Sequence, residues 1–98
     1  MTTTIWIHQA RPRTAWYELG DEKKRELRDR WNSLDTAAVE SGAEHVGTYS
    51  ARGQSDYSTV EVWRFESPER VFDFWNARVA ADYAVWFAFS NQVGSSVS

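Results

Sequence analysis

The sequence predicts an α+β fold in which two helices cover one face of a four-stranded antiparallel sheet. Strand-like segments at the start, middle and end of the chain alternate with two segments of helical spacing. The 98 residues, 42% of them hydrophobic and 15% aromatic, supply one core but not two domains. Since the chain has no cysteine, disulfide frameworks, thiolate metal sites and cysteine nucleophiles are excluded. A net charge of −3 gives no bias towards nucleic acid or anionic membranes.

The first half of the chain predicts one strand and one long helix. Residues 3–10 are rich in β-branched and aromatic side chains, which favours a strand. Residues 11–20 form a connection. A helix then runs from Asp21, its expected cap, to about Ser41, and Gly42 follows it. Its apolar residues recur at helical spacing: Leu27, Trp31, Leu34 and Ala38.

The middle of the chain predicts a hairpin followed by a second helix. Residues 43–51 and 57–66 have strand composition, and a hairpin loop at 52–56 joins them. Ser67 and Pro68 are typical of a helix start. The expected apolar face of this helix consists of Val71, Phe72, Trp75 and Val79.

The end of the chain completes the order β-α-β-β-α-β, which is the ferredoxin-like pattern. We expect a turn within 81–85, a last strand over 86–93 and a loose tail over 94–98, so that 1–98 forms a single domain. Right-handed crossovers place the first and third strands at the centre of the sheet. The second strand then lies beside the third, and the fourth beside the first.

Alternation along the strands divides the sheet residues into two sets. An aliphatic set, expected beneath the helices, contains Ile5, Ile7, Val46, Val60 and Val62. The other set contains Trp6, His8, His45, Tyr49, Glu61, Trp63 and Phe65. An open face with so many rings favours an interface or a ligand site, so we expect a homodimer whose two such faces enclose a pocket. The alternative is a monomer whose rings are covered by residues 11–20 and the tail.

The element order and the segment EVWRFESPE, residues 61–69, resemble the dimeric α/β-barrel superfamily near its antibiotic-biosynthesis-monooxygenase branch. Trp16-x-x-Leu19 and the segment from Trp86 to Gly94 are more similar to small bacterial barrels without an assigned reaction. The superfamily includes cofactor-free monooxygenases, isomerases and cyclases, haem-handling enzymes and members with no known reaction.

The sequence departs from the family pattern in the second helix. The monooxygenase branch commonly has a histidine a few residues into that helix, where this chain has the segment from Asp73 to Ala77. Haem-degrading members use a helix histidine as axial ligand. This departure argues against haem and weakens a monooxygenase role without excluding it, and we expect no cofactor.

Glu61 and His8 are the candidate catalytic residues. Glu61 lies in mid-strand on the ring-bearing face, where loss of hydration would raise its pKa towards that of a general base. His8 lies on the neighbouring strand and could transfer protons near neutral pH. The alternative for Glu61 is a structural carboxylate held by Arg52, Arg64 or a backbone donor.

The other polar and aromatic residues of this face are expected to bind substrate: Trp6, His45, Tyr49, Trp63, Phe89 and Asn91, with Gln92 as a further hydrogen-bonding group. Trp31 and Trp75 are expected in the helix–sheet core. We expect no metal site, because His8 and His45 lie about 10 Å apart across the third strand. No Gly-rich phosphate loop, G-x-S-x-G or H-E-x-x-H occurs, which excludes nucleotide binding, serine hydrolysis and zinc proteolysis.

Together these features predict a homodimeric barrel that binds a small hydrophobic molecule, aromatic or polyketide-like. It would be a cofactor-independent enzyme of the monooxygenase, isomerase or cyclase type that abstracts a proton. The alternative is a non-catalytic ligand-binding or assembly module of the same fold. We expect a soluble, cytoplasmic protein without nucleic-acid or membrane partners, because neither a signal peptide nor an apolar span of about 20 residues is present.

Overall fold

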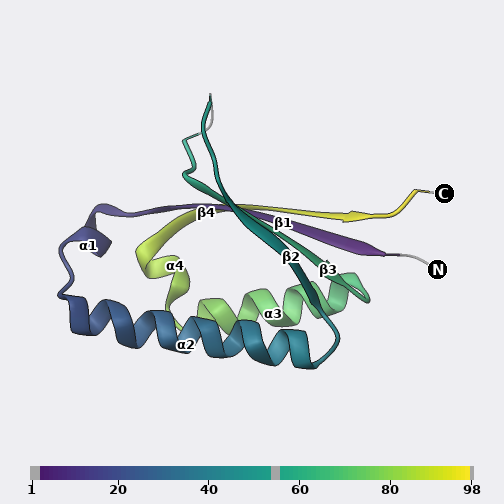
Figure 1. The fold of residues 1–98 in the computed structure, drawn as a ribbon, viewed down its shortest axis with the longest axis horizontal. Coiled ribbons are helices and arrows are strands. Elements are labelled where there is room, and N and C mark those ends of the chain that lie inside the picture. The colour runs from purple at the N-terminus through teal and green to yellow at the C-terminus, as the bar shows by residue number, and fades with distance from the viewer. Residues whose placement is uncertain (1–2, 54–55, 98) are drawn as a thin grey trace.

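The structure is a computed structural model that describes residues 3–53 and 56–97 and has the expected ferredoxin-like α+β fold (Figure 1). The four strands are β1 (Thr4–Pro12), β2 (Glu44–Ser50), β3 (Thr59–Phe65) and β4 (Phe87–Ser95). The long helices are α2 (Asp21–Glu40) and α3 (Pro68–Ala80), and α1 (Thr14–Tyr17) and α4 (Tyr83–Trp86) are single turns. The sheet order is β2-β3-β1-β4 with every neighbouring pair antiparallel, as predicted.

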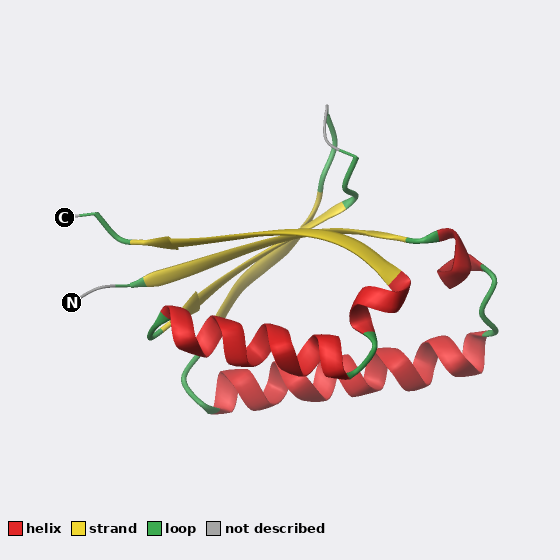
Figure 2. Cartoon of the chain, turned by 180° about the vertical axis from the view of Figure 1, so that it is seen from behind, coloured by secondary structure: helices red, strands yellow, loops and turns green. Residues whose placement is uncertain are grey.

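The molecule has two layers. Both long helices lie on the same face of the sheet, and no element of the described chain covers the other face (Figure 2). The β2–β3 hairpin rises beyond the sheet at its far end (Figure 1). In the described residues no helix has the length and apolar character needed to cross a membrane.

Helix α2 follows the predicted periodicity. Leu27 and Trp31 are buried, and Leu34 and Ala38 pack beside them. Gly20, rather than Asp21, occupies the cap position, and Asp21 is the first helical residue. Its charge still favours the helix N-terminus. Gly42 has φ +108°, the left-handed conformation expected of a glycine that ends a helix.

Helix α3 begins as predicted but turns a different face to the sheet. The Ser67 hydroxyl accepts a hydrogen bond of 3.4 Å from the Arg70 amide. The buried residues are Val71, Phe74 and Arg78. The predicted placement of Phe72 and Val79 in the core was wrong, since they are 55% and 43% exposed. The sequence prediction considered only apolar residues and therefore missed Arg78, which is buried on the same face as Val71 and Phe74.

The prediction of which sheet face the helices cover was also wrong. Trp6, His8 and Trp63 are fully buried beneath the helices. Ile5, Ile7, Val60 and Val62 are only half-buried, on the uncovered face. Alternation separates the two sets without saying which one the helices cover. In this protein the large rings of Trp6 and Trp63 fill the space between the sheet and the helices.

A bulge in β2 changes the predicted register. His45 opposes Trp63 as expected, but beyond the irregularity at 45–47 Tyr49 opposes Val60 rather than Thr59. A shift by one residue moves a side chain to the other face. Tyr49 consequently lies on the uncovered face, 53% exposed, with its ring over Gly47. A methyl group on Gly47 would lie 2.5 Å from the Tyr49 hydroxyl.

The C-terminal part also differs in detail. Asp82 adopts φ +67° at the predicted turn, and α4 follows it before β4 begins at Phe87. β4 runs to Ser95, so Gly94 and Ser95 belong to the strand rather than to a tail. Ser98 lies outside the described residues.

The observed orientation of α3 predicts opposite effects for two neighbouring phenylalanines. Phe74→Ala should lower the free energy of unfolding by about 3–5 kcal/mol, because a ring that is 6% exposed leaves a cavity. Phe72→Ala, the matched control on the solvent side, should change it by less than about 0.5 kcal/mol. Urea unfolding of both variants measures the difference, and equal losses would contradict this orientation.

Candidate active site

A buried arginine joins the sheet to both long helices. Arg78 projects from α3 and is 2% exposed. Its Nη1 and Nη2 donate hydrogen bonds of 3.0 and 2.8 Å to the two carboxylate oxygens of Glu61 on β3. Nη2 also donates to Asp35 Oδ1 on α2, at 3.0 Å. A buried charge is tolerated when it is paired and hydrogen-bonded in this way.

Aromatic rings surround the same guanidinium. It lies 4.8 Å from the ring centre of Phe74, 5.2 Å from that of Tyr83 and 5.4 Å from that of Trp6. At these distances the cation is attracted to the ring faces. Arg78 Nε has no hydrogen-bond partner among the described residues. The three rings and the two carboxylates therefore surround the guanidinium.

Arg78 reverses the expected pKa shift of Glu61. Burial acts to raise the pKa, but the hydrogen bonds and charge of Arg78 outweigh it, so the Glu61 pKa lies below its usual value. The predicted direction was wrong. Trp63 Nε1 also donates to Glu61 Oε1 at 3.1 Å. Glu61 is therefore an ionised partner of Arg78 in this structure, and Arg64 bonds instead to Glu44.

Asp35 behaves differently from Glu61. Among the described residues its carboxylate accepts a single hydrogen bond, from Arg78, and its side chain is 29% exposed, against 14% for Glu61. Burial raises the pKa of Asp35, and the charge of Arg78 only partly offsets this effect. Asp35 is thus the more weakly held of the two carboxylates.

His8 forms the neutral half of the site. Its Nδ1 lies 2.6 Å from Asn91 Oδ1, and its Nε2 lies 2.8 Å from the Tyr83 hydroxyl. Since an amide oxygen only accepts, Nδ1 carries the proton and Nε2 accepts from Tyr83. Burial lowers the pKa of His8 and raises that of Tyr83. The imidazole is therefore neutral and the phenol protonated near pH 7.

The structure brings most of the predicted site residues together, on the covered face. Trp6 stacks on His8 with ring centres 5.0 Å apart, and Phe89 stacks at 6.3 Å. Trp63 and Asn91 contact Glu61 and His8 as described above. His45 stacks on Trp63 at 4.5 Å but is exposed and bonded to Thr48. Tyr49 and Gln92 are not part of this group.

Three residues of the site were missed from the sequence: Asp35, Arg78 and Tyr83. Arg78 lies four residues after Phe74, one helical turn along the same face. Asp35 follows Leu34 on the buried side of α2. Helical spacing was the available signal for both, whereas Tyr83 belongs to a segment that had been expected to form a turn.

The described residues contain no group of three His, Cys, Asp or Glu that could hold a metal ion. The two histidines of the chain both lie on strands, and α3 has none. Both ring nitrogens of His8 are hydrogen-bonded, and His45 Nε2 is bonded to Thr48. These residues do not fit a haem held by a helix histidine, as used by haem-degrading members of the superfamily that the sequence resembles.

Comparisons with known proteins support the fold. No family model and no curated protein matches the sequence. A tryptophan-to-phenylalanine mutant of chlorite dismutase from Candidatus Nitrospira defluvii, in complex with cyanide, superposes with a TM-score of 0.80 at 13% identity, over 98% of this chain and 40% of its own. The same enzyme with imidazole gives 0.78 at 12% identity, over 97% and 40%.

A further chain, provisionally assigned as a chlorite dismutase, gives a TM-score of 0.71 at 14% identity, over 94% of this chain and 43% of its own. This protein thus spans about two fifths of the length of the structures it resembles. At such low identity the similarity shows the ferredoxin-like fold and nothing finer.

The neutral state of His8 predicts a pH-dependent stability. Because its pKa is lowered in the folded protein, the unfolded chain takes up the proton first as the pH falls below about 6.5. The free energy of unfolding should then fall by up to about 1.4 kcal/mol per pH unit until folded His8 is protonated. Urea unfolding between pH 7.5 and 5.5 measures this slope.

His8→Gln should remove this slope, whereas His45→Gln, on exposed β2, should retain it. Asp35 titrates in all of these proteins, so its effect cancels in the comparison. A wild-type slope equal to that of His8→Gln would show that buried His8 is not held neutral.

Proposed function

We propose that the protein is a homodimeric barrel that binds a small, largely apolar molecule and acts on it by proton transfer without a cofactor. The observation that supports this proposal is the neutral imidazole of His8, held at both nitrogens inside an aromatic layer. The proposed reaction is of the monooxygenase, isomerase or cyclase type, as expected from the sequence. Since Glu61 is ion-paired with Arg78, the proposed base is His8.

The hydrogen bonds of His8 with Asn91 and Tyr83 determine which of its ring nitrogens can accept a proton. Asn91 Oδ1 accepts a hydrogen bond from the Nδ1–H group of His8, which fixes the tautomer whose lone pair is on Nε2. Tyr83 donates to that lone pair and can pass a proton to it while its oxygen takes one from a substrate. The substrate then loses one proton, His8 gains one and Tyr83 is unchanged. A neutral imidazole near pH 7 suits general base catalysis.

Arg78 would stabilise the negative charge that this transfer leaves on the substrate. Its guanidinium lies over the Tyr83 ring, so it is close to the group that meets the substrate. Fixed charges in a dry site act strongly because no water must reorganise around them. Glu61 and Asp35 hold Arg78 in place, which makes them positioning residues.

The aromatic surroundings support an apolar, ring-containing substrate. Trp6, Trp75 and Phe89 lie 5.0, 5.3 and 6.3 Å from the His8 ring. Trp75 and Phe89 are only partly buried and offer flat apolar contact area to a planar molecule, whereas Trp6 is fully buried and stacks on the His8 ring. His45, Tyr49 and Trp63 are further removed from His8, and their predicted role in binding stays a prediction.

The alternative is a non-catalytic ligand-binding or assembly module. It is favoured by the saturation of the network, because His8 is 0% exposed and both of its nitrogens are bonded within the chain. Such a network also joins sheet and helices without any chemistry.

A second copy of the chain would cover the uncovered sheet face. Ile5, Ile7, Val60 and Val62 form an aliphatic surface there, and Tyr49 lies beside it, 53% exposed. Apolar surfaces of this kind mark interfaces. Pairing of two such faces keeps the dimeric barrel that the sequence resembles, although it uses the aliphatic residues and not the rings.

Proton abstraction can be tested before the substrate is known. In D2O, ketones and 1,3-diketones with an apolar ring should exchange an acidic C–H for deuterium when the enzyme deprotonates them, which proton NMR detects. His8→Gln should slow exchange by about 10²–10⁴-fold, because it removes the base. Glu61→Gln should lower the melting temperature, and its exchange rate per folded molecule should fall less than that of His8→Gln.

His45→Gln is the matched control for this experiment and should exchange like the wild type. Compounds that bind without exchange would support the non-catalytic module. Exchange that survives in folded His8→Gln would end the assignment of His8 as the base.

Assembly through the sheet face predicts a dimer of about twice the chain mass of 11.3 kDa. Val62→Lys should shift the protein to monomer, since a lysine there would be buried unpaired against the second copy. Val79→Lys, the same change on the outward side of α3, should leave the dimer intact. Sedimentation velocity at micromolar concentration distinguishes them, and a monomeric wild type would contradict this interface.

A further inference from the structure

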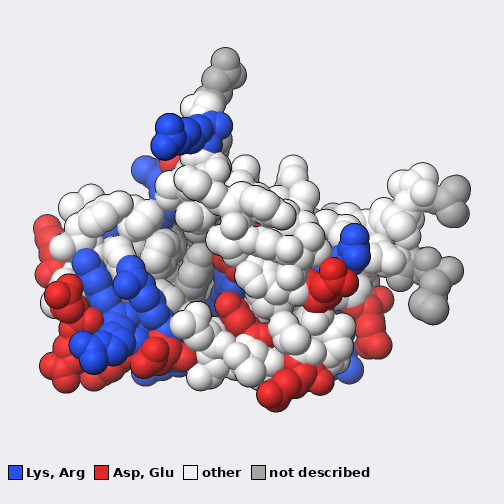
Figure 3. All heavy atoms as spheres, in the orientation of Figure 1, with Lys and Arg blue, Asp and Glu red and all other residues white. Residues whose placement is uncertain are grey.

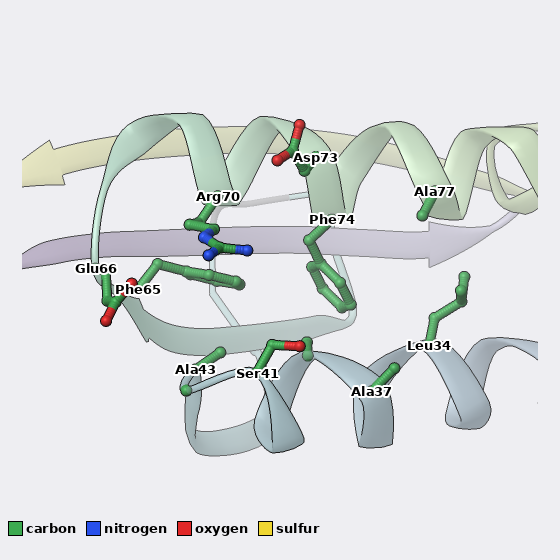
Figure 4. Close-up of a pocket in the computed structure, with 12 residues that line it drawn as sticks. Leu34, Ala37, Ser41, Ala43, Phe65, Glu66, Arg70, Asp73, Phe74 and Ala77 are labelled. Atoms are coloured by element: carbon green, nitrogen blue, oxygen red, sulfur yellow. The ribbon is translucent and has the colours of Figure 1, made fainter.

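A cavity of about 210 Å³ lies between the end of α2 and the start of α3 (Figure 4). Ala37 and Ala38 of α2 line it, together with Ala77 of α3. Because methyl side chains are too short to fill the space between two packed helices, a gap remains there. Leu34, Phe65 and Phe74 complete its apolar wall.

The size of the cavity restricts what could occupy it. An apolar cavity of about 150 Å³ accommodates benzene, and sites for drug-sized ligands span about 300–1,000 Å³. A volume of about 210 Å³ therefore matches one ring, or a branched chain of similar size, with a short substituent. The opening at the helix ends would let that substituent reach solvent.

The charged residues at the opening of the cavity determine which substituent of a ligand would be favoured there. Arg70 lies there, and its guanidinium extends across the opening between Phe65 and Phe74 (Figure 4). The carboxylates of Glu66 and Asp73 also border the cavity; that of Asp73 lies on the outer side of α3, and that of Glu66 lies at the end next to Phe65 (Figure 4). Among the described residues no ion pair or side-chain hydrogen bond is found for Arg70, in contrast to Arg78. A guanidinium without a partner, above an apolar cavity, is suited to a carboxylate.

We propose that this cavity is a binding site for a small aromatic or branched carboxylic acid, with the apolar part between α2 and α3 and the carboxylate on Arg70. The site differs from the proposed active site. Phe74 and Phe65 form its inner wall, and the centres of their rings lie 5.5 and 6.3 Å from that of Trp6. Since Trp6 stacks on His8, these three rings lie between the cavity and His8. None of His8, Tyr83, Asn91, Glu61 and Arg78 lines it.

The experiment uses phenylacetate as the probe, with amide shifts of the ¹⁵N-labelled protein as the readout. Phenylacetate should bind with a Kd of the order of 1 mM, as expected for a ligand of few atoms. The shifts should cluster in residues 34–43 and 65–77. Phenylacetamide, of nearly the same shape without the charge, should bind about tenfold more weakly because it lacks the charge-assisted hydrogen bonds.

Two variants separate the two parts of the proposal. Arg70→Gln should lower phenylacetate affinity about tenfold and change phenylacetamide affinity much less, since the amide probe has no charge to pair with Arg70. Arg25→Gln, an exposed arginine of α2 outside the cavity, should bind both as the wild type does. Ala77→Leu should abolish binding of both by filling the cavity.

The proposal is overturned if phenylacetate gives no localised shifts, if both probes bind equally, or if Arg70→Gln binds phenylacetate as the wild type does. Should Ala77→Leu fail to fold, the Arg70→Gln comparison still decides the outcome. Proton exchange at His8 is measured with other compounds, so its failure would leave this result unaffected.

Discussion

The ion pair between Arg78 and Glu61 is the interaction on which the arrangement of the helix–sheet layer depends. It connects α3 to β3, and the added hydrogen bond to Asp35 brings in α2. A buried guanidinium needs these partners, because an unpaired charge in such a position costs several kcal/mol. The rings of Trp6, Phe74 and Tyr83 then pack around a cation whose position is already determined. One charged group thus orders residues from most elements of the fold.

This ion pair also divides the site into an ionised half and a neutral half. Arg78 keeps Glu61 charged, whereas His8, Tyr83 and Asn91 form a chain of neutral groups beside it, since His8 is the cross-strand partner of Glu61. Tyr83 belongs to both, because it bonds to His8 and lies beneath Arg78. A proton moved within the neutral half is therefore close to a fixed positive charge. The same fold in chlorite dismutases, at 12–13% identity, says nothing about this chemistry, which depends on the residues present here.

The two faces of the sheet carry side chains of different volume. One face packs against the helices, and the other is the proposed dimer interface. Rings fill the covered face, between the sheet and the helices. Short aliphatic residues occupy the other face, which suits the close approach of a second sheet. Where α2 and α3 carry alanines instead of rings, the layer is not filled and the cavity beneath Arg70 results. Packing volume therefore accounts for the core, the proposed interface and the cavity together.

The sequence by itself determined the order of the strands and long helices along the chain, the Ser67 cap, the end of α2 before Gly42, the strand order in the sheet and the grouping of His8 with Glu61 on one face. These features follow from spacing and backbone preference, which act over a few residues. Only the tertiary structure decided that the rings face the helices, that a bulge turns Tyr49 away and that Arg78 lowers the pKa of Glu61. Periodicity describes directions relative to a single element. Which element lies opposite, and which charge it brings, depends on residues distant in the chain, as Arg78 is 17 residues from Glu61.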